Sequence, residues 1–373
     1  MILQFEVSGL CNRSCDYCLR SYAEVCKRNL SFEEFRKVVE EAQSYDRIEK
    51  ILLYGFGEPG MNPEIGRIVR FSSSIAEVIL LTNGLSLKKL SKDELESVTL
   101  GFSVHENVRE AISTLKSLKN AESKVELEVV LDKHNVYKLK EVVNQGLDVS
   151  SSNLLAYDRG HYSRVAYCEV SRRCVEIVED FAREVGWERL KEVVDGMRHF
   201  EPKSLEVYSE LSERASREGY QLNLSWIVEN RERIAIAKKA EIAAKEAVEV
   251  GKEAGVKVTI PSFFADSVSR ECPYRNTVFV RADCTLSPCM EFSYSHKEYV
   301  NDHEKFVESV RYGSFREALD DFKSLKDVNR YPWCGDCQLK QFCWFAEKAM
   351  DCYGYKPSCS ECLYSTGIVS CRQ

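Results

Sequence analysis

The chain begins with MILQFEVSGLCNRSCDYC (residues 1–18), an apolar run followed by three cysteines spaced C-x3-C-x2-C. The run at 2–8 predicts a buried strand, and Cys11, Cys15 and Cys18 fall on the loop after it. Three thiolates fill three corners of a cuboidal iron-sulfur cluster and leave one iron open, whereas a cluster that only carries electrons normally has four cysteines. A structural zinc site completed by Cys26 is the alternative interpretation.

This first strand opens a repeating pattern. Further strands are predicted at 50–55, 77–82, 98–104, 125–131 and 152–157, and amphipathic helices between them at 31–44, 62–73, 88–97, 107–118 and 135–145. The alternation predicts an α/β fold with a parallel sheet curled into a partial (β/α)6, TIM-like barrel. Because chemistry in such barrels collects at the carboxyl ends of the strands, the cysteine loop lies where a site is expected.

The rest of the chain departs from the repeat, and three domains are predicted: a barrel core at 1–160, a helical connecting segment at 161–260 and a Cys-rich region at 261–373. Helices are predicted at 174–186, 188–197, 203–219 and 229–255, with short apolar runs at 221–226 and 256–261. From residue 261 the strand rhythm fades and Cys, Pro and aromatic residues increase, so bound metal is expected to stabilise this region.

Composition excludes several classes of function. With 373 residues, 44% of them hydrophobic, the chain can bury a large core. Its net charge of −7 without a basic run argues against a nucleic-acid partner. The apolar runs are shorter than the roughly 20 residues of a membrane span, and no secretory leader is recognised, so a cytoplasmic protein without a membrane partner is expected.

Sixteen cysteines in such a chain indicate metal binding rather than disulfides. Besides the first triplet, ten lie near the carboxyl end: Cys272, Cys284, Cys289, Cys334, Cys337, Cys343, Cys352, Cys359, Cys362 and Cys371. Two four-iron clusters would use eight of these ten, and zinc is the alternative because C-x2-C pairs recur. The remaining Cys26, Cys168 and Cys174 are expected to be small buried or incidental thiols.

Residues 1–157 resemble the radical S-adenosylmethionine (SAM) superfamily through the cysteine triplet with Tyr17, the stretch GFGEP (55–59) and the stretch TNG (82–84). The resemblance implies that the triplet holds a [4Fe-4S] cluster whose open iron chelates SAM, and that reductive cleavage of SAM yields a 5'-deoxyadenosyl radical. It also implies contacts to the cofactor from Tyr17, Gly55, Gly57, Glu58, Pro59, Thr82, Asn83, Ser103 and His105. A structural role for His105 is an equal alternative.

Two of these residues carry specific expectations. A side chain at Gly57 is expected to crowd a ligand, because glycine lets the backbone approach closely. The carboxylate of Glu58 is expected to accept a charge-assisted hydrogen bond from the ammonium group of SAM.

The stretches 272–289 and 334–343 resemble the SPASM extension of radical SAM enzymes, which implies two auxiliary [4Fe-4S] clusters and a protein or peptide substrate. Two positions depart from the SPASM pattern, because Cys284 stands where glycine is usual and Glu347 where cysteine is usual. Residues 287–319 and the tail at 351–371 resemble the maturases associated with tungsten-dependent aldehyde ferredoxin oxidoreductases.

The expected function is therefore a radical SAM maturase acting on a protein, peptide or cofactor, such as that of a tungsten oxidoreductase, with ferredoxin or flavodoxin as electron donor. Asp283, Glu291 and Asp336 are the candidate catalytic bases. Three alternatives stay open: a radical SAM enzyme that forms thioether or carbon-carbon crosslinks in peptides, a non-catalytic iron-sulfur electron carrier, and a zinc-stabilised binding module.

Overall fold

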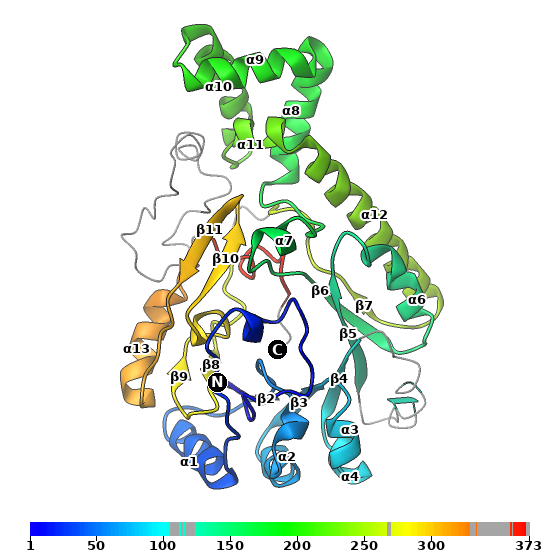
Figure 1. The fold of residues 1–373 in the computed structure, drawn as a ribbon, viewed down its shortest axis with the longest axis vertical. Coiled ribbons are helices and arrows are strands. Elements are labelled where there is room, and N and C mark those ends of the chain that lie inside the picture. Colours follow the sequence, from blue (N-terminus) through cyan, green and yellow to red (C-terminus); the bar gives the residue numbers. More distant parts are fainter. Residues whose placement is uncertain are drawn as a thin grey trace.

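The architecture is that of a computed structural model, which describes residues 1–104, 112, 115–116, 124–266, 270–328, 333, 359 and 361–370. Among these residues, nine strands form one sheet in the order β7-β6-β5-β4-β3-β2-β1-β8-β9 (Figure 1). Their bounds are β1 (Ile2–Phe5), β2 (Lys50–Leu53), β3 (Glu77–Thr82), β4 (Thr99–Ser103), β5 (Val125–Leu131), β6 (Asp148–Asn153), β7 (Val258–Thr259), β8 (Thr277–Val280) and β9 (Leu286–Ser287).

The first six strands confirm the predicted parallel repeat. Each pairs with the next one along the chain in parallel register, beginning with Ile2 opposite Lys50. Strands β1 and β2 are largely apolar and buried, as is typical of parallel strands covered on both faces. The sheet is curled, and β7 and β9 form its two edges (Figure 1).

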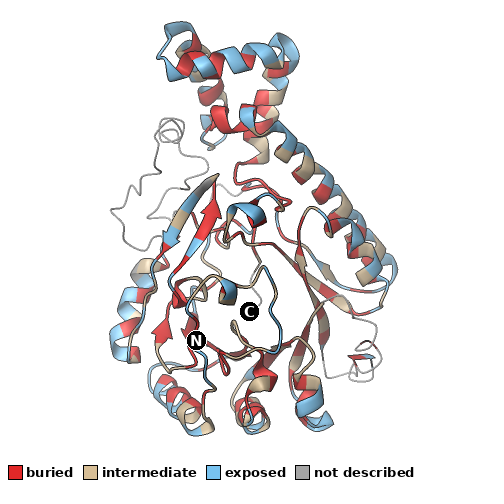
Figure 2. Cartoon of the chain, viewed as in Figure 1, coloured by how far each residue is buried: buried red, intermediate tan, exposed pale blue. Residues whose placement is uncertain are grey.

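Short helices cover the outer face of the curled sheet, and Figure 2 shows their inner sides buried and their outer sides exposed. Ser31 begins the first of them with a reciprocal capping box to Glu34. The helix predicted at 88–97 is two helices, because Ser91 starts a new one with its own capping box to Glu94. The bounds are α1 (Phe32–Gln43), α2 (Ile65–Ser73), α3 (Ser86–Lys89), α4 (Lys92–Glu96) and α6 (Leu139–Val143). The short helix α7 (Arg159–Tyr162) lies instead beside the β10 segment, and the 3-10 turns are η1 (Leu19–Ser21), η2 (Pro59–Met61) and η3 (Val136–Lys138).

The sixth strand lies earlier in the chain than the predicted range 152–157. Strand β6 ends at Asn153, whereas the apolar run predicted as strand continues to Tyr157. Ala156 in this run instead belongs to a second apolar cluster with Tyr299 and Leu363 from the carboxyl-terminal region. The run is therefore apolar because the carboxyl-terminal region packs on it, not because it pairs in the sheet.

The helices predicted at 174–255 are confirmed. They are α8 (Arg172–Val185), α9 (Trp187–Arg198), α10 (Pro202–Ser216) and α12 (Arg231–Glu253), and the short run at 221–226 leads into a further helix, α11 (Leu224–Glu229). Helices α8 to α11 project from one end of the molecule, and α12 runs back along the barrel beside α6 (Figure 1).

The expectation that strands fade after residue 261 was wrong. Strand β8 has the apolar sequence TVFV and extends the barrel sheet by pairing in parallel with β1. Strands β10 (His296–Val300) and β11 (His303–Val307) form an antiparallel hairpin, preceded by the turn η4 (Glu291–Ser293) and followed by α13 (Phe315–Leu325). The described helices include none with the length and apolarity required to cross a membrane.

Candidate active site and cysteine-lined cavity

The loop after β1 gathers the first three cysteines. Cys11, Cys15 and Cys18 are all half-buried, and the amide of Cys18 donates to the carbonyl of Cys15 over 3.2 Å. Burial raises the pKa of the Cys18 thiol, and the Cys15 and Cys11 thiols raise it further, which places the three thiols close together. Tyr17 lies next to these thiols, and its burial and then its contact with Cys15 raise the pKa of its phenol. Three soft donors on one loop fit a cluster that leaves one iron open.

The glycines of the GFGEP stretch fit closely against this loop and the residues that lead into it. A Cβ at Gly57 would lie 1.9 Å from the carbonyl oxygen of Ser8 and 2.7 Å from that of Leu10. A Cβ at Gly55 would lie 2.7 Å from Cβ of Glu6. The loops after β1 and β2 therefore touch backbone to backbone, and it is this contact that excludes a side chain at Gly57.

Glu58 braces the next loop. Its carboxylate is buried and accepts hydrogen bonds from the Thr82 hydroxyl (2.6 Å), the Asn83 amide (2.8 Å), the Ser86 hydroxyl (2.9 Å) and the Gly60 amide (3.1 Å). Four donors match the acceptor capacity of a carboxylate. This geometry gives Glu58 a positioning role, and its contact with SAM stays a prediction.

Asn83 connects the TNG stretch to the cysteine loop. Its side-chain nitrogen lies 3.6 Å from Sγ of Cys11 and donates to Oδ1 of Asn12 over 2.9 Å. Pro59 is buried at the start of η2, and Ser103 is the last residue of β4. The loops at the carboxyl ends of β1, β2 and β3 are thus in direct contact, and their role as one site stays a prediction. His105 lies outside the described residues.

Residues 5–132, which carry these loops, match the family description "Radical SAM superfamily". The chain is a radical SAM enzyme. A relative from Pyrococcus furiosus, described as "Tungsten-containing aldehyde ferredoxin oxidoreductase cofactor-modifying protein", is 24% identical, and the match covers 99% of this chain and 96% of the relative. Membership of the radical SAM enzymes implies a [4Fe-4S] cluster and SAM as cofactors.

Two solved structures are also similar. SuiB of Streptococcus suis bound to S-adenosylmethionine has 12% identity and a TM-score of 0.49, covering 92% of this chain and 71% of SuiB. The protein anSMEcpe with bound AdoMet has 14% identity and a TM-score of 0.41, covering 90% of this chain and 87% of its own. Because both TM-scores are below 0.5, the fold of this chain is described from its own strand order.

A second group of cysteines in this radical SAM enzyme lines a cavity beside the β10–β11 hairpin. Burial raises the pKa of each of the four thiols, and several of them raise one another's pKa, so they lie close together. They come from two segments far apart in the sequence. The four are Cys272, Cys289, Cys359 and Cys362.

Three basic side chains lie near these thiols. Lys305 and Lys326 line the same cavity, and burial lowers the pKa of Lys326 to about 8. Arg270 is buried and donates to the carbonyl of Cys359 over 2.8 Å. Four thiolates and their metal carry net negative charge, so the cations fit an anionic centre in this cavity. The sequence offered no signal for these cations, because single basic residues are common.

Three further cysteines lie outside the set that lines the cavity. Cys284 lies on the turn between β8 and β9 with a φ of 67°, outside the set that lines the cavity. Burial raises its pKa to about 11, with nearby Cys26 among the smaller causes. Cys168 and Cys174 are buried in the main apolar core, as expected. Cys334, Cys337, Cys343, Cys352, Cys371 and the candidate base Asp336 lie outside the described residues.

The two candidate bases within the described residues each have a cationic partner. Asp283 lies 3.2 Å from Arg281 and accepts from the Thr285 hydroxyl over 2.6 Å. Glu291 lines the cavity, and its Oε1 lies 3.1 Å from Nε2 of His296. Although burial opposes it, contacts with Glu298 and His296 lower the pKa of Glu291 to about 2. Their role as bases stays a prediction.

His296 and Glu298 were missed by the sequence reasoning. Both are buried on β10, two residues apart and therefore on one face of the strand. Burial and then the charge of Glu291 raise the pKa of Glu298 to about 8. Burial favours neutral His296, but the two glutamates raise its pKa to about 10.

Glu6 was also missed, although it lies directly after β1. It is fully buried, and its carboxylate accepts hydrogen bonds from the Tyr294 hydroxyl and from the amides of Phe56 (3.2 Å) and Ala282 (3.4 Å). Burial raises the pKa of Glu6 to about 7 despite these donors. Glu6 thus links the end of β1 and the GFGEP stretch to the carboxyl-terminal region.

Proposed function

We propose that this radical SAM enzyme is a maturase with at least two metal centres, one on the Cys11, Cys15 and Cys18 loop and an auxiliary [4Fe-4S] cluster at Cys272, Cys289, Cys359 and Cys362. The observation that supports the second centre is the convergence of four thiols from distant segments on one cavity that Lys305 and Lys326 also line. A four-cysteine set would hold a closed cluster, whereas the triplet leaves one iron open.

Different residues support each of the two proposed centres. When bound, the first cluster and SAM supply a 5'-deoxyadenosyl radical that removes a hydrogen atom from the substrate. Glu58 holds the TNG stretch in place, and Asn83 holds that stretch against Cys11. Around the auxiliary centre, Lys305 and Lys326 would offset the charge of the thiolates.

The substrate is proposed from the likeness to the Pyrococcus furiosus relative, whose name describes a protein that modifies the cofactor of a tungsten-containing oxidoreductase. By that likeness, this chain acts on the same class of substrate, a cofactor or the polypeptide that carries it. Ferredoxin or flavodoxin is proposed as the electron donor, because reductive SAM cleavage needs a one-electron donor. A second auxiliary cluster would require cysteines outside the described residues.

Metal analysis after anaerobic reconstitution tests the proposal. Each four-iron cluster contributes about 4 irons and 4 sulfides, so the two proposed centres predict about 8 irons per chain and a second auxiliary cluster about 12. Replacing Cys11, Cys15 and Cys18 together with alanine should remove about 4 irons and abolish 5'-deoxyadenosine formation. Cys289→Ala with Cys362→Ala should lower the iron content while SAM cleavage persists.

Cys168→Ala is the matched control, since it removes a buried thiol from the core and should leave the iron content unchanged. Zinc in place of iron in the wild-type protein would support the zinc-stabilised alternative, because four cysteines also bind zinc. Full iron loading without SAM cleavage would favour an electron carrier. Incubation with a tungsten oxidoreductase, followed by mass analysis of its polypeptide and cofactor, tests the substrate.

A further inference from the structure

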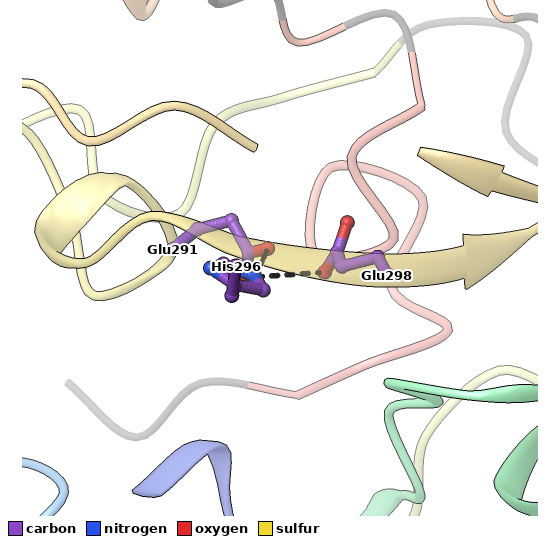
Figure 3. A group of neighbouring side chains, drawn as sticks. All are labelled: Glu291, His296 and Glu298. Carbon is purple, nitrogen blue, oxygen red and sulfur yellow. Dashed lines mark hydrogen bonds and ion pairs between the residues drawn. The ribbon is translucent and has the colours of Figure 1, made fainter. Parts of the chain in front are cut away.

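The geometry assigns a binding site for one divalent first-row transition-metal ion to Glu291, His296 and Glu298, which we propose as a centre distinct from the cysteine sites. Figure 3 shows the three side chains converging, with Glu291 from the η4 turn and the other two from β10. One ligand atom from each residue can be chosen so that all three lie within 4.8 Å of one another. The inference does not depend on what the cysteines bind.

The separations between the donor atoms suit a single ion. Nε2 of His296 lies 3.1 Å from Oε1 of Glu291 and 3.9 Å from Oε1 of Glu298. With metal–ligand bonds of about 2.1 Å, two ligands of one ion can be at most about 4.2 Å apart. Both separations from Nε2 satisfy this limit.

The imidazole is oriented as a metal ligand. Nδ1 of His296 lies 2.7 Å from the carbonyl oxygen of Tyr294 and donates to it, so an incoming ion would displace the proton of Nε2, which faces the two carboxylates. A histidine that ligates a metal usually donates its other ring nitrogen in this way, which fixes both tautomer and ring orientation. The ring is fully buried, and the edge-to-face contact with Tyr157, 5.6 Å between centroids, restricts it further.

A bound cation would stabilise the two buried carboxylates of this site. The side chains of Glu291 and Glu298 are only 13% and 5% exposed, and two carboxylates so close repel each other. Lys305, opposite Glu298 in the hairpin, faces the other oxygen, Oε2, at 3.9 Å. Oε1 of Glu298 is thus left to His296 and the ion, and a divalent cation would neutralise both glutamates.

The donor types narrow the choice of metal. One imidazole nitrogen and two carboxylate oxygens suit manganese, iron or zinc, whereas calcium and magnesium prefer oxygen alone. Glu291 and Glu298 also line the cavity that holds the four cysteines. Further coordination positions of the ion would therefore open toward that cavity, where a substrate group or water could bind.

Manganese titration of the cluster-loaded protein tests the inference, because Mn²⁺ avoids thiolates and its free form is counted by electron paramagnetic resonance. The wild type is expected to bind one Mn²⁺ per chain, with a pulsed-resonance coupling from one imidazole nitrogen. Glu298→Gln should weaken binding at least about tenfold, and His296→Gln should also abolish the nitrogen coupling.

Glu304→Gln is the matched control, since Glu304 lies on the facing strand and is exposed in a surface pair with Lys297. It should bind Mn²⁺ like the wild type. Equal binding by Glu298→Gln and Glu304→Gln would overturn the inference, and so would a wild-type protein that binds no Mn²⁺ or gives no nitrogen coupling. The coupling is measured on the wild type, so the inference stays testable even if a variant fails to fold. A wild-type protein without Mn²⁺ binding or without the nitrogen coupling would mean that the three residues form an internal ion-pair network.

Discussion

At the residue scale, Gly57 connects the sequence pattern to the packing of the site. A methyl group there would overlap the carbonyl oxygen of Ser8, 1.9 Å away, and backbone cannot yield as a flexible side chain would. Gly57→Ala should therefore lower the free energy of unfolding by about 3 kcal/mol and weaken SAM binding. Thermal unfolding and SAM titration measure both. Gly313→Ala is the control, because nothing lies within 4 Å of its Cβ position, and an equal loss there would contradict the packing argument.

Glu6 predicts a pH dependence of stability. Its pKa is raised from 4.5 to about 7 in the folded protein, so the folded state holds the proton more tightly than the unfolded chain. This contribution is complete below about pH 4.5 and is lost as the pH rises through about 7, at up to about 1.4 kcal/mol per pH unit. Glu6→Gln cannot titrate, so the melting temperature of the wild type minus that of the variant should fall between pH 5 and 8. The exposed Glu49→Gln should show no such trend.

Site residues that belong to a motif with fixed spacing could be predicted from the sequence, and isolated site residues could not. The cysteine triplet, GFGEP and TNG are recognisable because several members stand at fixed distances along the chain. Glu6 and His296 are single polar residues within or beside apolar runs, and they meet their partners only after folding. The reason for Gly57 was also beyond the sequence, since it depends on the approach of another loop.

At the scale of elements, Arg164 ties the cysteine loop across the barrel mouth. Its guanidinium reaches Asp16, between Cys15 and Cys18, at 2.7 Å and Asp132, which follows β5, at 2.8 Å. Arg164→Lys keeps the charge but cannot hold two carboxylates in a fork. We expect a loss of about 1 kcal/mol, because the pair with Asp16 is largely exposed, and a severalfold faster release of iron to a chelator.

Arg183→Lys is the matched control for Arg164, since Arg183 pairs with Asp180 on the exposed side of one helix. Iron release from that variant should follow the wild type. Asp16→Asn should reproduce the faster release seen in Arg164→Lys. If neither Asp16→Asn nor Arg164→Lys changes the rate, the bridge does not hold the cysteine loop.

Most strands and helices could be predicted because period and burial agree. Strand β5, for example, was predicted with its observed bounds. Strand β6 could not be, because its own sequence DVSSSN is polar, while the apolar residues after it pack on the carboxyl-terminal region. An apolar run reports burial, and only the pairing of strands distinguishes a sheet from another buried surface.

At the scale of the whole molecule, Arg233 joins the predicted helical segment to the carboxyl-terminal region. It extends from α12 to Glu169 at 2.7 Å and to Asp302, in the turn of the β10–β11 hairpin, at 3.5 Å. Its guanidinium also lies over the ring of Tyr162, 4.0 Å from the centroid. The hairpin that carries His296 and Glu298 is thereby fixed to the helical segment.

Arg233→Met should lower the free energy of unfolding by about 4 kcal/mol, because Glu169 is fully buried and would be left without its cationic partner. Adding Glu169→Gln to that variant should recover much of the loss, since the lone buried charge is then removed. Arg189→Met, which breaks an exposed pair on α9, should cost less than about 0.5 kcal/mol. Denaturant unfolding of the four proteins measures these differences. A double variant no more stable than Arg233→Met would mean that packing around the guanidinium, rather than the buried charge of Glu169, holds the hairpin in place.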